Sequence, residues 1–500
     1  MASLLQFRVA LLSGRSIALE FASTLVQIKV LAAKYAACCA TRIRTCSVFP
    51  LGCSSELSRV EPVRLLPRTA SLVEVRREIE RRLHAGSVSL FAADGRHLAG
   101  AGSLENAGVT DGNCTLTATI HPARIIGHRE TPAFALLQAD GSVVTWGSRD
   151  YGGDSSAVQQ QLTQVSQIRS SHGAFAAICG KGRVVTWGAS HLGGQSSSVQ
   201  HLLQGVRHLE ASHGAFAAIL DNGGVVTWGD SDVGGDSSHV QDQLFEVTCI
   251  AATFGAFAAL RMDGHVVTWG DPFYSSDSSM VQDKLVNVCQ IKASGRSFAA
   301  VLGDGSVVAW DRRKLQSCGG DCRDVEDMLK GVHFIAATDQ AFAALRCDAR
   351  VVTWGNKRYG AESRLFENRL QDVQHILGSD RAFAALLKNG RVLAWGDPKY
   401  GGDTRFVRDE LQDVVQIASS SAAFAAVRGD GTVVTWGDPE AGGDSLPVQA
   451  KLRQVQHVTG SFQAFAAMLV DGQVVTWGSA ESGGDCGDLQ LLSAHGQNRT

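Results

Sequence analysis

The sequence predicts a mainly β protein whose larger part is a β-propeller, a ring of small sheets that cover one another. A Val-Val-Thr-Trp-Gly pattern recurs nine times with few changes, and it contains every tryptophan of the chain: Trp146, Trp187, Trp228, Trp269, Trp310, Trp354, Trp395, Trp436 and Trp477. The spacing is 41 residues, with one step of 44 between Trp310 and Trp354. Short strands repeated with such a period are typical of propeller blades. We expect seven to nine blades.

Each repeat contains a predicted β-hairpin. In the second repeat, residues 174–178 and 184–188 are β-prone runs on either side of Gly182, and most other repeats place Asp-Gly or Asn-Gly in this gap. Alternation along the second run puts Val185 and Trp187 on one face of the sheet. Small alanines in the partner run would let neighbouring sheets approach closely.

The stretch between hairpins allows more than one interpretation. Seven of the nine repeats keep a Gly-Gly pair after the tryptophan. In the first repeat, Ser155-Ser156 then precedes apolar residues at Val158, Leu162, Val165 and Ile168. This spacing fits an amphipathic helical stretch or an outer edge strand followed by a return strand. We favour a short strand or turn at the serines, a helical turn over Leu162 and a strand ending at Ile168.

Composition sets broad limits on function. The 500 residues carry a formal net charge of −3, which gives no general attraction to nucleic acid. The 12 cysteines do not repeat with the 41-residue unit, so a disulfide framework is not expected and a reducing compartment is favoured. No uncharged apolar run reaches the length of a membrane-spanning helix. We therefore expect a cytoplasmic or nuclear protein, although the basic N-terminus leaves organelle targeting open.

Residues 1–121 are expected to form a separate α+β domain. Strands at 7–12 and 16–21 would make a hairpin, and 71–85 is an amphipathic helix with a stripe at Leu72, Val75, Ile79 and Leu83. Further strands are expected at 88–91 and 115–119. An insertion near 25–70 contains a second helix-like run at 25–35. The propeller would then occupy residues 122–490, and 491–500 would be a disordered tail.

The repeats resemble those of the regulator-of-chromosome-condensation superfamily. The stretch from Gly214, GAFAAILDNGGVVTWGDSDVGGDSS, followed by VQDQL, is similar to the short repeats of propeller-type β-lactamase inhibitor proteins and of the propeller segments of HECT-class ubiquitin ligases. Family propellers usually have seven blades, whereas nine hairpins occur here. Nine blades, eight blades with a hanging end, and an open spiral all remain possible.

The order of elements in residues 1–121 resembles the ubiquitin-like β-grasp domain: hairpin, helix, strand and final strand. The insertion near 25–70 departs from that family. The domain runs into His121-Pro122 without a Gly-Gly end. A ubiquitin-like domain here would therefore be a docking module and not a conjugated tag.

The sequence indicates no catalytic site. It has no nucleophile elbow and no phosphate-binding Gly-Lys-Ser loop. Cys318 and Cys322 form a close pair without the second pair that a zinc site needs. Several histidines recur at repeat positions and are interpreted as isolated surface residues: His172, His213, His239, His265 and His375. We expect no catalytic residue, cofactor or metal.

Two groups of residues are candidates for contact with a partner. Four tyrosines lie five residues after a repeat tryptophan and would form a ring on one face: Tyr151, Tyr274, Tyr359 and Tyr400. They either pack on the neighbouring loops or form an interaction rim, since tyrosine is favoured at contact hot spots. The second group, Arg312, Arg313 and Lys314, follows Trp310, where the repeat lengthens. It is interpreted as a solvated turn or a contact specific to one blade.

These observations favour a non-catalytic scaffold for protein–protein interaction. The resemblance to HECT-ligase propellers implies a ubiquitin-pathway adaptor or substrate receptor, since no catalytic domain of that class is expected after Trp477. Some family propellers are nucleotide-exchange factors for small GTPases, which gives a second hypothesis. A third is an inhibitor that caps an enzyme with the tyrosine-bearing face. Partners would be proteins, with no membrane or nucleic acid implied.

Overall fold

The structure is a computed structural model. It describes residues 123–138, 140–311, 318–362 and 369–487, and before these only the backbone of six strands. Residues 1–123 form one compact unit, and the propeller forms a second unit that begins at Arg124. The expected helix at 71–85, the loop Arg312–Lys314 and the expected tail at 491–500 lie outside the described residues.

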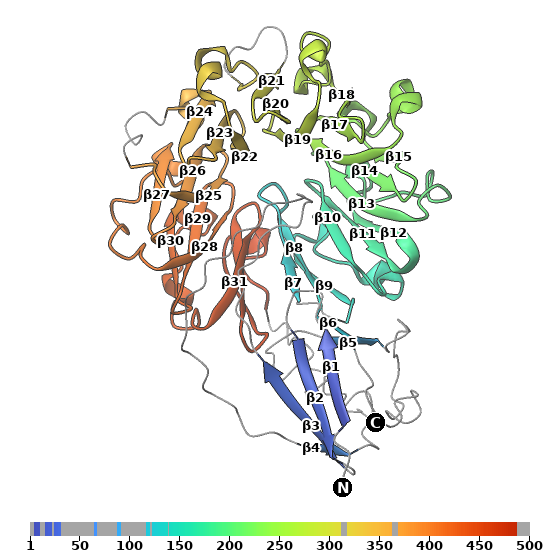
Figure 1. The fold of residues 1–500 in the computed structure, drawn as a ribbon, viewed down its shortest axis with the longest axis vertical. Helices are drawn as coiled ribbons and strands as arrows, with labels where there is room; N and C mark the ends of the chain where they lie inside the picture. The colour runs from blue at the N-terminus through green and yellow to red at the C-terminus, as the bar shows by residue number, and fades with distance from the viewer. Residues whose placement is uncertain are drawn as a thin grey trace. The chain divides into compact units, whose positions relative to one another are not determined.

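Nine antiparallel three-stranded sheets, one for each repeat, make up the described part of the propeller (Figure 1). Successive strands are neighbours in every sheet, so each blade is one continuous meander. The first strand of each blade is innermost and the third is outermost (Figure 1). The blades are numbered 1 to 9 in chain order below.

The predicted hairpins are formed by the second and third strands. The first strands are β7 (Arg124–Ile126), β10 (Gln167–Ser170), β13 (Val206–Ala211), β16 (Val247–Ala252), β19 (Val288–Ala293), β22 (Val332–Ala337), β25 (Val373–Gly378), β28 (Val414–Ser419) and β31 (Val455–Gly460). The second strands are β8 (Ala133–Leu137), β11 (Ala174–Cys179), β14 (Ala215–Leu220), β17 (Ala256–Arg261), β20 (Phe298–Leu302), β23 (Ala341–Arg346), β26 (Ala382–Leu387), β29 (Ala423–Arg428) and β32 (Ala464–Leu469). The third strands are β9 (Val143–Gly147), β12 (Arg183–Gly188), β15 (Val225–Gly229), β18 (Val266–Gly270), β21 (Val307–Trp310), β24 (Val351–Gly355), β27 (Val392–Gly396), β30 (Val433–Gly437) and β33 (Val474–Gly478).

The connections contain short 3₁₀ turns and no fourth strand among the described residues. One set follows Trp-Gly: η1 (Arg149–Tyr151), η4 (Ser190–Leu192), η5 (Ser231–Val233), η7 (Pro272–Tyr274), η10 (Lys357–Tyr359), η12 (Pro398–Tyr400), η13 (Pro439–Ala441) and η15 (Ala480–Ser482). An outer set lies at the serine pairs or at the equivalent positions of other repeats: η2 (Ser156–Gln161), η6 (Ser238–Gln243), η8 (Gln282–Lys284), η9 (Arg323–Met328) and η14 (Leu446–Val448). A further turn, η3 (Gly180–Gly182), lies in the hairpin of blade 2. Of the short strand or turn expected at Ser-Ser, the structure has the turn. In blade 1, Gln159 of this segment donates a hydrogen bond to the Val143 carbonyl (3.0 Å), which fastens the turn to the blade.

Large rings on one blade pack against small side chains on the next. In blade 2, Phe175 and Trp187 are cross-strand neighbours with stacked rings 5.3 Å apart. With Val185 they pack against the alanines of β8 in blade 1. The opposite face of blade 2 presents Ala174, Ala176 and Val184 to the corresponding rings of blade 3. The predicted alternation and the predicted role of the alanines are both confirmed.

A hydrogen bond from each indole joins neighbouring blades. Trp187 Nε1 donates to the carbonyl of Gly152, in the loop of the preceding blade, at 3.0 Å. Gly152 has φ of 91°, and a Cβ there would lie 2.5 Å from the Phe175 ring, so only glycine fits without strain. The same type of bond occurs in all nine blades at 2.8–3.2 Å.

Blade 9 closes the ring against blade 1. Trp146 Nε1 donates to the Gly483 carbonyl at 3.2 Å, which repeats the contact seen between other neighbours. The Phe462 amide donates to the Thr131 carbonyl at 3.0 Å, and β31 contacts β7 (Figure 1). Neither sheet exchanges a strand with the other. The described residues thus form nine blades in a closed ring, which decides among the alternatives left open by the sequence.

The N-terminal unit contains one sheet with strand order β1 (Leu5–Ala10), β2 (Ser16–Ala22), β3 (Leu25–Leu31) and β4 (Leu65–Pro67), and a pair β5 (Val88–Phe91) and β6 (Thr117–Ile120). The predicted hairpin is present as β1 and β2. The predicted helix-like run at 25–35 is wrong in its first part, because β3 pairs along the free edge of β2. Its β-branched residues suit a strand. The described strands do not support a ubiquitin-like domain.

Candidate functional site

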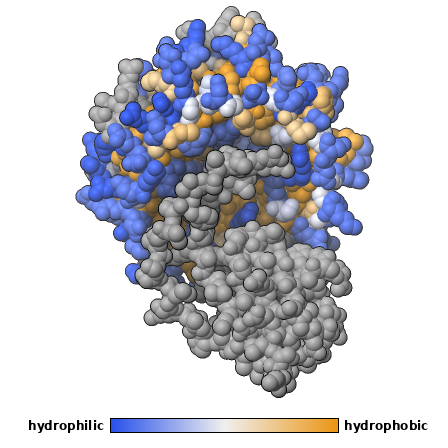
Figure 2. Space-filling model, viewed as in Figure 1, coloured by the Kyte–Doolittle hydropathy of each residue, from blue (hydrophilic) through white to orange (hydrophobic). Residues whose placement is uncertain are grey.

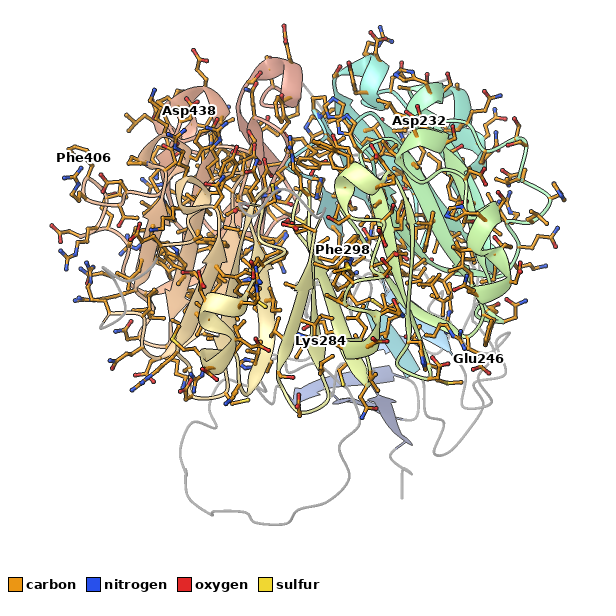
Figure 3. The ribbon with its side chains drawn as sticks, turned by 90° about the horizontal axis from the view of Figure 1, so that it is seen from above. Asp232, Glu246, Lys284, Phe298, Phe406 and Asp438 are labelled. Carbon is orange, nitrogen blue, oxygen red and sulfur yellow. The ribbon has the colours of Figure 1, made fainter. Side chains whose placement is uncertain are left out.

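One face of the ring carries two concentric sets of loops, and it is called the loop face here. In each blade the third strand runs back toward the start of the second, so the loop after Trp-Gly lies beside the turn that joins the first two strands. Asp232, in the loop after Trp228-Gly229, lies at this edge of the ring, whereas Lys284 and Glu246 lie at the opposite edge (Figure 3). The opposite edge, which carries the Asp-Gly hairpins, is called the hairpin face.

A hydroxyl ties the two sets of loops together. Ser171 Oγ donates to the Leu192 carbonyl at 2.8 Å and accepts a hydrogen bond from the Ala174 amide. In three blades the tethered carbonyl belongs to a predicted rim tyrosine: Thr253 bonds Tyr274, Thr338 bonds Tyr359 and Ser379 bonds Tyr400. The backbone of these tyrosines is therefore fixed to the inner turns.

The inner turns lie in a ring, called the collar here. Its members are Thr131, His172, His213, Phe254, Gly295, Asp339, Asp380, Ser421 and Phe462, one from each blade. Seven main-chain hydrogen bonds of 2.9–3.0 Å link neighbouring members, for example from the His172 amide to the His213 carbonyl. Because each turn is held by its neighbour, the side chains of the collar project from a fixed backbone.

The collar is chemically divided. In blades 2 to 4 its side chains are aromatic: His172 stacks on His213 with ring centres 4.4 Å apart, and Phe254 meets His213 edge-on at 6.4 Å. Each of these residues is followed by glycine. In blades 6 and 7 the members are Asp339 and Asp380. The interpretation of His172 and His213 as isolated residues is therefore wrong, since adjacent repeats place equivalent positions side by side.

A longer turn in blade 1 spans the collar. Eight residue steps separate Ile125 from Ala133, but only six separate the equivalent Ile168 and Ala174 of blade 2, so the turn has two extra residues. They extend a stretch that contains Arg129 and Glu130, which reach opposite sides of the ring.

Arg129 binds the acidic side of the collar. It donates to the Ser379 carbonyl at 2.7 Å, and its guanidinium lies 3.3 Å from Asp339 and 3.9 Å from Asp380. On the other side, Glu130 Oε2 lies 3.9 Å from His213 Nδ1. Blade 1 is thus connected to blades 3, 6 and 7 through polar contacts across the ring.

Burial controls the charge of these groups. Burial raises the pKa of Asp339 to about 6, although Arg129 opposes the rise. Burial and the neighbouring Asp339 raise the pKa of Asp380 to about 8. Burial raises the pKa of Glu130, but the nearby His213 and the positive neighbours outweigh this effect and lower the pKa overall. Two carboxyl groups thus compete for one guanidinium.

A hollow of about 270 Å³ opens beside this cluster. Its charged lining consists of Arg129, Glu130, Asp339 and Asp380. Its other walls are largely apolar or aromatic: His172, His213, Val233, Phe254, Tyr274 and Phe462. Lying on the aromatic–acidic boundary of the collar, it is the candidate binding site of the described propeller.

The predicted rim tyrosines surround the collar and are half-buried. Tyr151 meets His172 edge-on at 5.4 Å, and Tyr274 meets Phe254 at 6.3 Å. Tyr359 and Tyr400 hold the guanidinium of Arg381 between them, at 5.0 and 4.7 Å from the ring centres. The packing interpretation thus accounts for part of each ring, and the role of this rim in partner contact stays a prediction.

The sequence signal for this site is that one position of the repeat differs from blade to blade. The residue 15 before each tryptophan varies through His, Phe, Gly, Asp, Ser and Thr, while the Ala-Phe-Ala that follows hardly changes. Among the described residues, no group of His, Cys, Asp and Glu is arranged to hold a metal ion. None of the helices described is long and apolar enough to cross a membrane.

Figure 2 shows the outer edges of the blades as mostly hydrophilic, with hydrophobic surface toward the inside of the ring. Isolated apolar side chains also project outward, among them Phe406, which is 94% exposed at the rim (Figure 3). Scattered exposed apolar residues of this kind are normal and mark no site by themselves.

No family model and no curated protein matches the chain. Solved structures similar to it include the CRINKLY WD40 ectodomain of the Arabidopsis thaliana receptor kinase ACR4, at 14% identity over 53% of this chain and 93% of that one, with a TM-score of 0.34. Prp20p of Saccharomyces cerevisiae, the yeast RCC1, shares 17% identity over 48% of this chain and 74% of that one, with a TM-score of 0.32. Human WBSCR16 shares 15% sequence identity over 67% of this chain and 96% of its own chain, with a TM-score of 0.33. Similarities this low carry no argument about function.

Proposed function

We propose that this protein is a non-catalytic scaffold that binds other proteins through its loop face. The observation that supports this is where chemical variety occurs. The blade interfaces repeat the same Phe, Trp and Ala residues, whereas the collar is aromatic in blades 2 to 4 and acidic in blades 6 and 7, on a hydrogen-bonded backbone. A rigid surface that presents aromatic rings and paired charges suits specific protein recognition, because little ordering entropy is lost on binding.

The half-buried tyrosines would supply the contact area around the collar. Tyr359 and Tyr400 have their backbones fixed to the inner turns, so the exposed part of each side chain is already placed for contact, and Tyr151 packs edge-on against His172. The arginines and lysine of residues 312–314 remain a prediction for an additional contact on blade 5.

The test is partner capture with the full chain and a variant in which Tyr151, Tyr359 and Tyr400 are all replaced by alanine. We expect the variant to lose the partners that the unchanged chain retains, with a melting curve that stays cooperative. A matched control replaces Met262 and Val286, exposed residues of the hairpin face, by serine, and it should keep the partners. Equal capture by both variants would refute the loop face as the contact surface.

A narrower proposal is that the scaffold acts as an adaptor or substrate receptor in the ubiquitin pathway. It is supported by the resemblance of the repeats to HECT-ligase propellers. A ubiquitin-transfer assay should show no thioester on this chain, but ubiquitin transfer to a captured partner when a ligase is added. If captured partners include no ubiquitin-pathway protein, the narrower proposal fails and the scaffold role stands.

A small GTPase is the alternative partner that the same face could bind. An exchange assay separates the two functions, because an exchange factor accelerates nucleotide release from a purified GTPase at low concentrations of the propeller. We expect no acceleration from an adaptor.

A further inference from the structure

The hollow at the collar combines two features that together favour one type of ligand. One wall holds the carboxyl groups of Asp339 and Asp380, and Oδ1 of Asp339 is buried without a hydrogen-bond partner in the described structure, although Arg129 lies 3.3 Å away. The other walls are collar rings from blades 2, 3, 4 and 9, together with Tyr274 and Val233. Carboxylates attract a cation, and ring faces attract it further when water is excluded.

The acidic groups that line the hollow outnumber the basic groups. Three carboxyl groups and one guanidinium line the hollow, and Arg129 is already shared between Asp339 and Asp380. Arg381, another cation near this pair, is held between Tyr359 and Tyr400. Even with Asp380 protonated near neutral pH, the carboxylates of Glu130 and Asp339 outnumber the single guanidinium of Arg129. A bound cation would therefore bring the lining closer to neutrality, whereas an anion or a phosphate would meet repulsion.

Size limits the ligand to one small group. At about 270 Å³ the hollow is near the lower end of the range for small-molecule sites, so it fits a single side chain better than a nucleotide or a cofactor. A planar guanidinium matches both walls, since it binds carboxylates with paired hydrogen bonds and stacks on aromatic rings. The neighbouring arrangement of Arg381 between two tyrosine rings shows the second of these contacts on the same face.

We propose that the collar hollow binds the side chain of an arginine that projects from a partner protein, between the carboxyl groups of Asp339 and Asp380 and the rings of His213 and Phe254. This rests on the proposed scaffold function and specifies the partner: a protein with an exposed arginine at the tip of a loop or near a terminus. The surrounding tyrosines would then contact the segments on either side of that arginine.

The test is calorimetric titration of the full chain with the peptide acetyl-Gly-Ser-Arg-Ser-Gly-amide. The matched peptide carries citrulline in place of arginine, which keeps the shape and removes the charge. We expect the arginine peptide to bind at least tenfold more tightly than the citrulline peptide. This comparison uses the unaltered protein, so it does not depend on the folding of any variant. Equal affinity of the two peptides would overturn the proposal.

Single substitutions test whether the arginine peptide binds in the hollow. Asp339→Asn and Asp380→Asn should each weaken the arginine peptide at least tenfold, and Phe254→Ala severalfold. Asp232→Asn is the control, since Asp232 is an exposed acid of the same face that does not line the hollow (Figure 3). If Asp232→Asn weakens the peptide as much as the collar variants do, the peptide is attracted to negative surface in general, and a specific site is refuted. If the arginine peptide binds no more tightly than the citrulline peptide, while the tyrosine variant still loses its partners, the arginine site is refuted and the scaffold function stands.

Discussion

The blade interfaces and the collar are built from the same repeat but follow opposite rules. At the interfaces, a buried Phe, a buried Trp and its hydrogen bond to a loop carbonyl recur in every blade. At the collar, adjacent blades differ in aromaticity, charge and turn length. The repeated positions stabilise the ring, and the varied positions give it a distinct surface. Mutations at the two kinds of position should therefore differ in effect.

The largest expected effect is at an interface. Trp228 is 3% exposed, packs with the stacked Phe216 and donates to the Gly193 carbonyl. Trp228→Ala should lower the free energy of unfolding by about 3–5 kcal/mol, because it leaves a cavity and an unpaired carbonyl. Urea denaturation monitored by circular dichroism measures this. Phe406→Ala is the control, and its 94% exposure predicts a change within about 0.5 kcal/mol.

The second largest loss of stability is expected where the loop of blade 1 contacts the Phe175 ring of blade 2. Gly152→Ala would place a Cβ 2.5 Å from the Phe175 ring at a φ of 91°. We expect a loss of about 2–3 kcal/mol from the left-handed backbone and the overpacking. Thermal and urea unfolding both report it. Unchanged stability would mean that the loops do not contact the ring of the next blade as described.

Loss of the Arg129 contacts across the collar should lower stability by a smaller amount, and this amount should depend on pH. Arg129→Met removes the cation between Asp339 and Asp380 and leaves the Ser379 carbonyl without its donor. We expect a loss of about 2 kcal/mol near pH 8, since buried carboxylates without a partner are costly. The loss should shrink near pH 5, where these carboxyl groups take up protons. A loss that does not vary between these pH values would contradict the assigned network.

The smallest effect concerns a single carboxyl group. Burial raises the pKa of Asp380 from 3.8 to about 8, so the folded chain binds this proton more tightly than the unfolded chain does. Its stabilising contribution is complete below about pH 4 and is lost as pH rises toward 8. Relative to Asp380→Asn, the unchanged protein should therefore lose stability over this window. We expect a difference on the order of 1 kcal/mol, because Asp339 shares the proton.

Urea midpoints of the two proteins at matched pH values measure this difference. Groups such as His128 and His172, whose pKa values burial lowers, titrate in both proteins and cancel in the comparison. A difference that stays constant between pH 4 and 8 would show that Asp380 is not a buried carboxyl with a raised pKa.

Most of the ring could be predicted from the sequence because its cause is local and repeated. Alternation along the strand puts Val185 and Trp187 on one face, and an Asp-Gly or Gly turn sets the hairpin register. The number of blades in a closed ring could not be predicted, since closure depends on a contact between Trp146 and Gly483, which lie 337 residues apart. The short segment after each serine pair was ambiguous because its apolar spacing suits both a strand and a helical turn.

The collar was missed for a different reason. His172 and His213 look isolated along the chain, and only the ring places them 4.4 Å apart. Arg129 pairs with Asp339 and Asp380, more than 200 residues away, through two extra residues in one turn. Comparing equivalent positions around the expected ring would have revealed the aromatic and acidic sides, but not the hollow between them.

The most direct test of the account is the closure of the ring, on which the collar depends. In a closed ring the indole of Trp146 fills an interface like any other, so Trp146→Ala should cost as much as Trp228→Ala, within about 1 kcal/mol. In an open array blade 1 would be terminal, and Trp146 would have no partner loop from blade 9. Equal losses in urea unfolding are the result the closed ring predicts, and a loss near zero for Trp146→Ala beside a full loss for Trp228→Ala would contradict it.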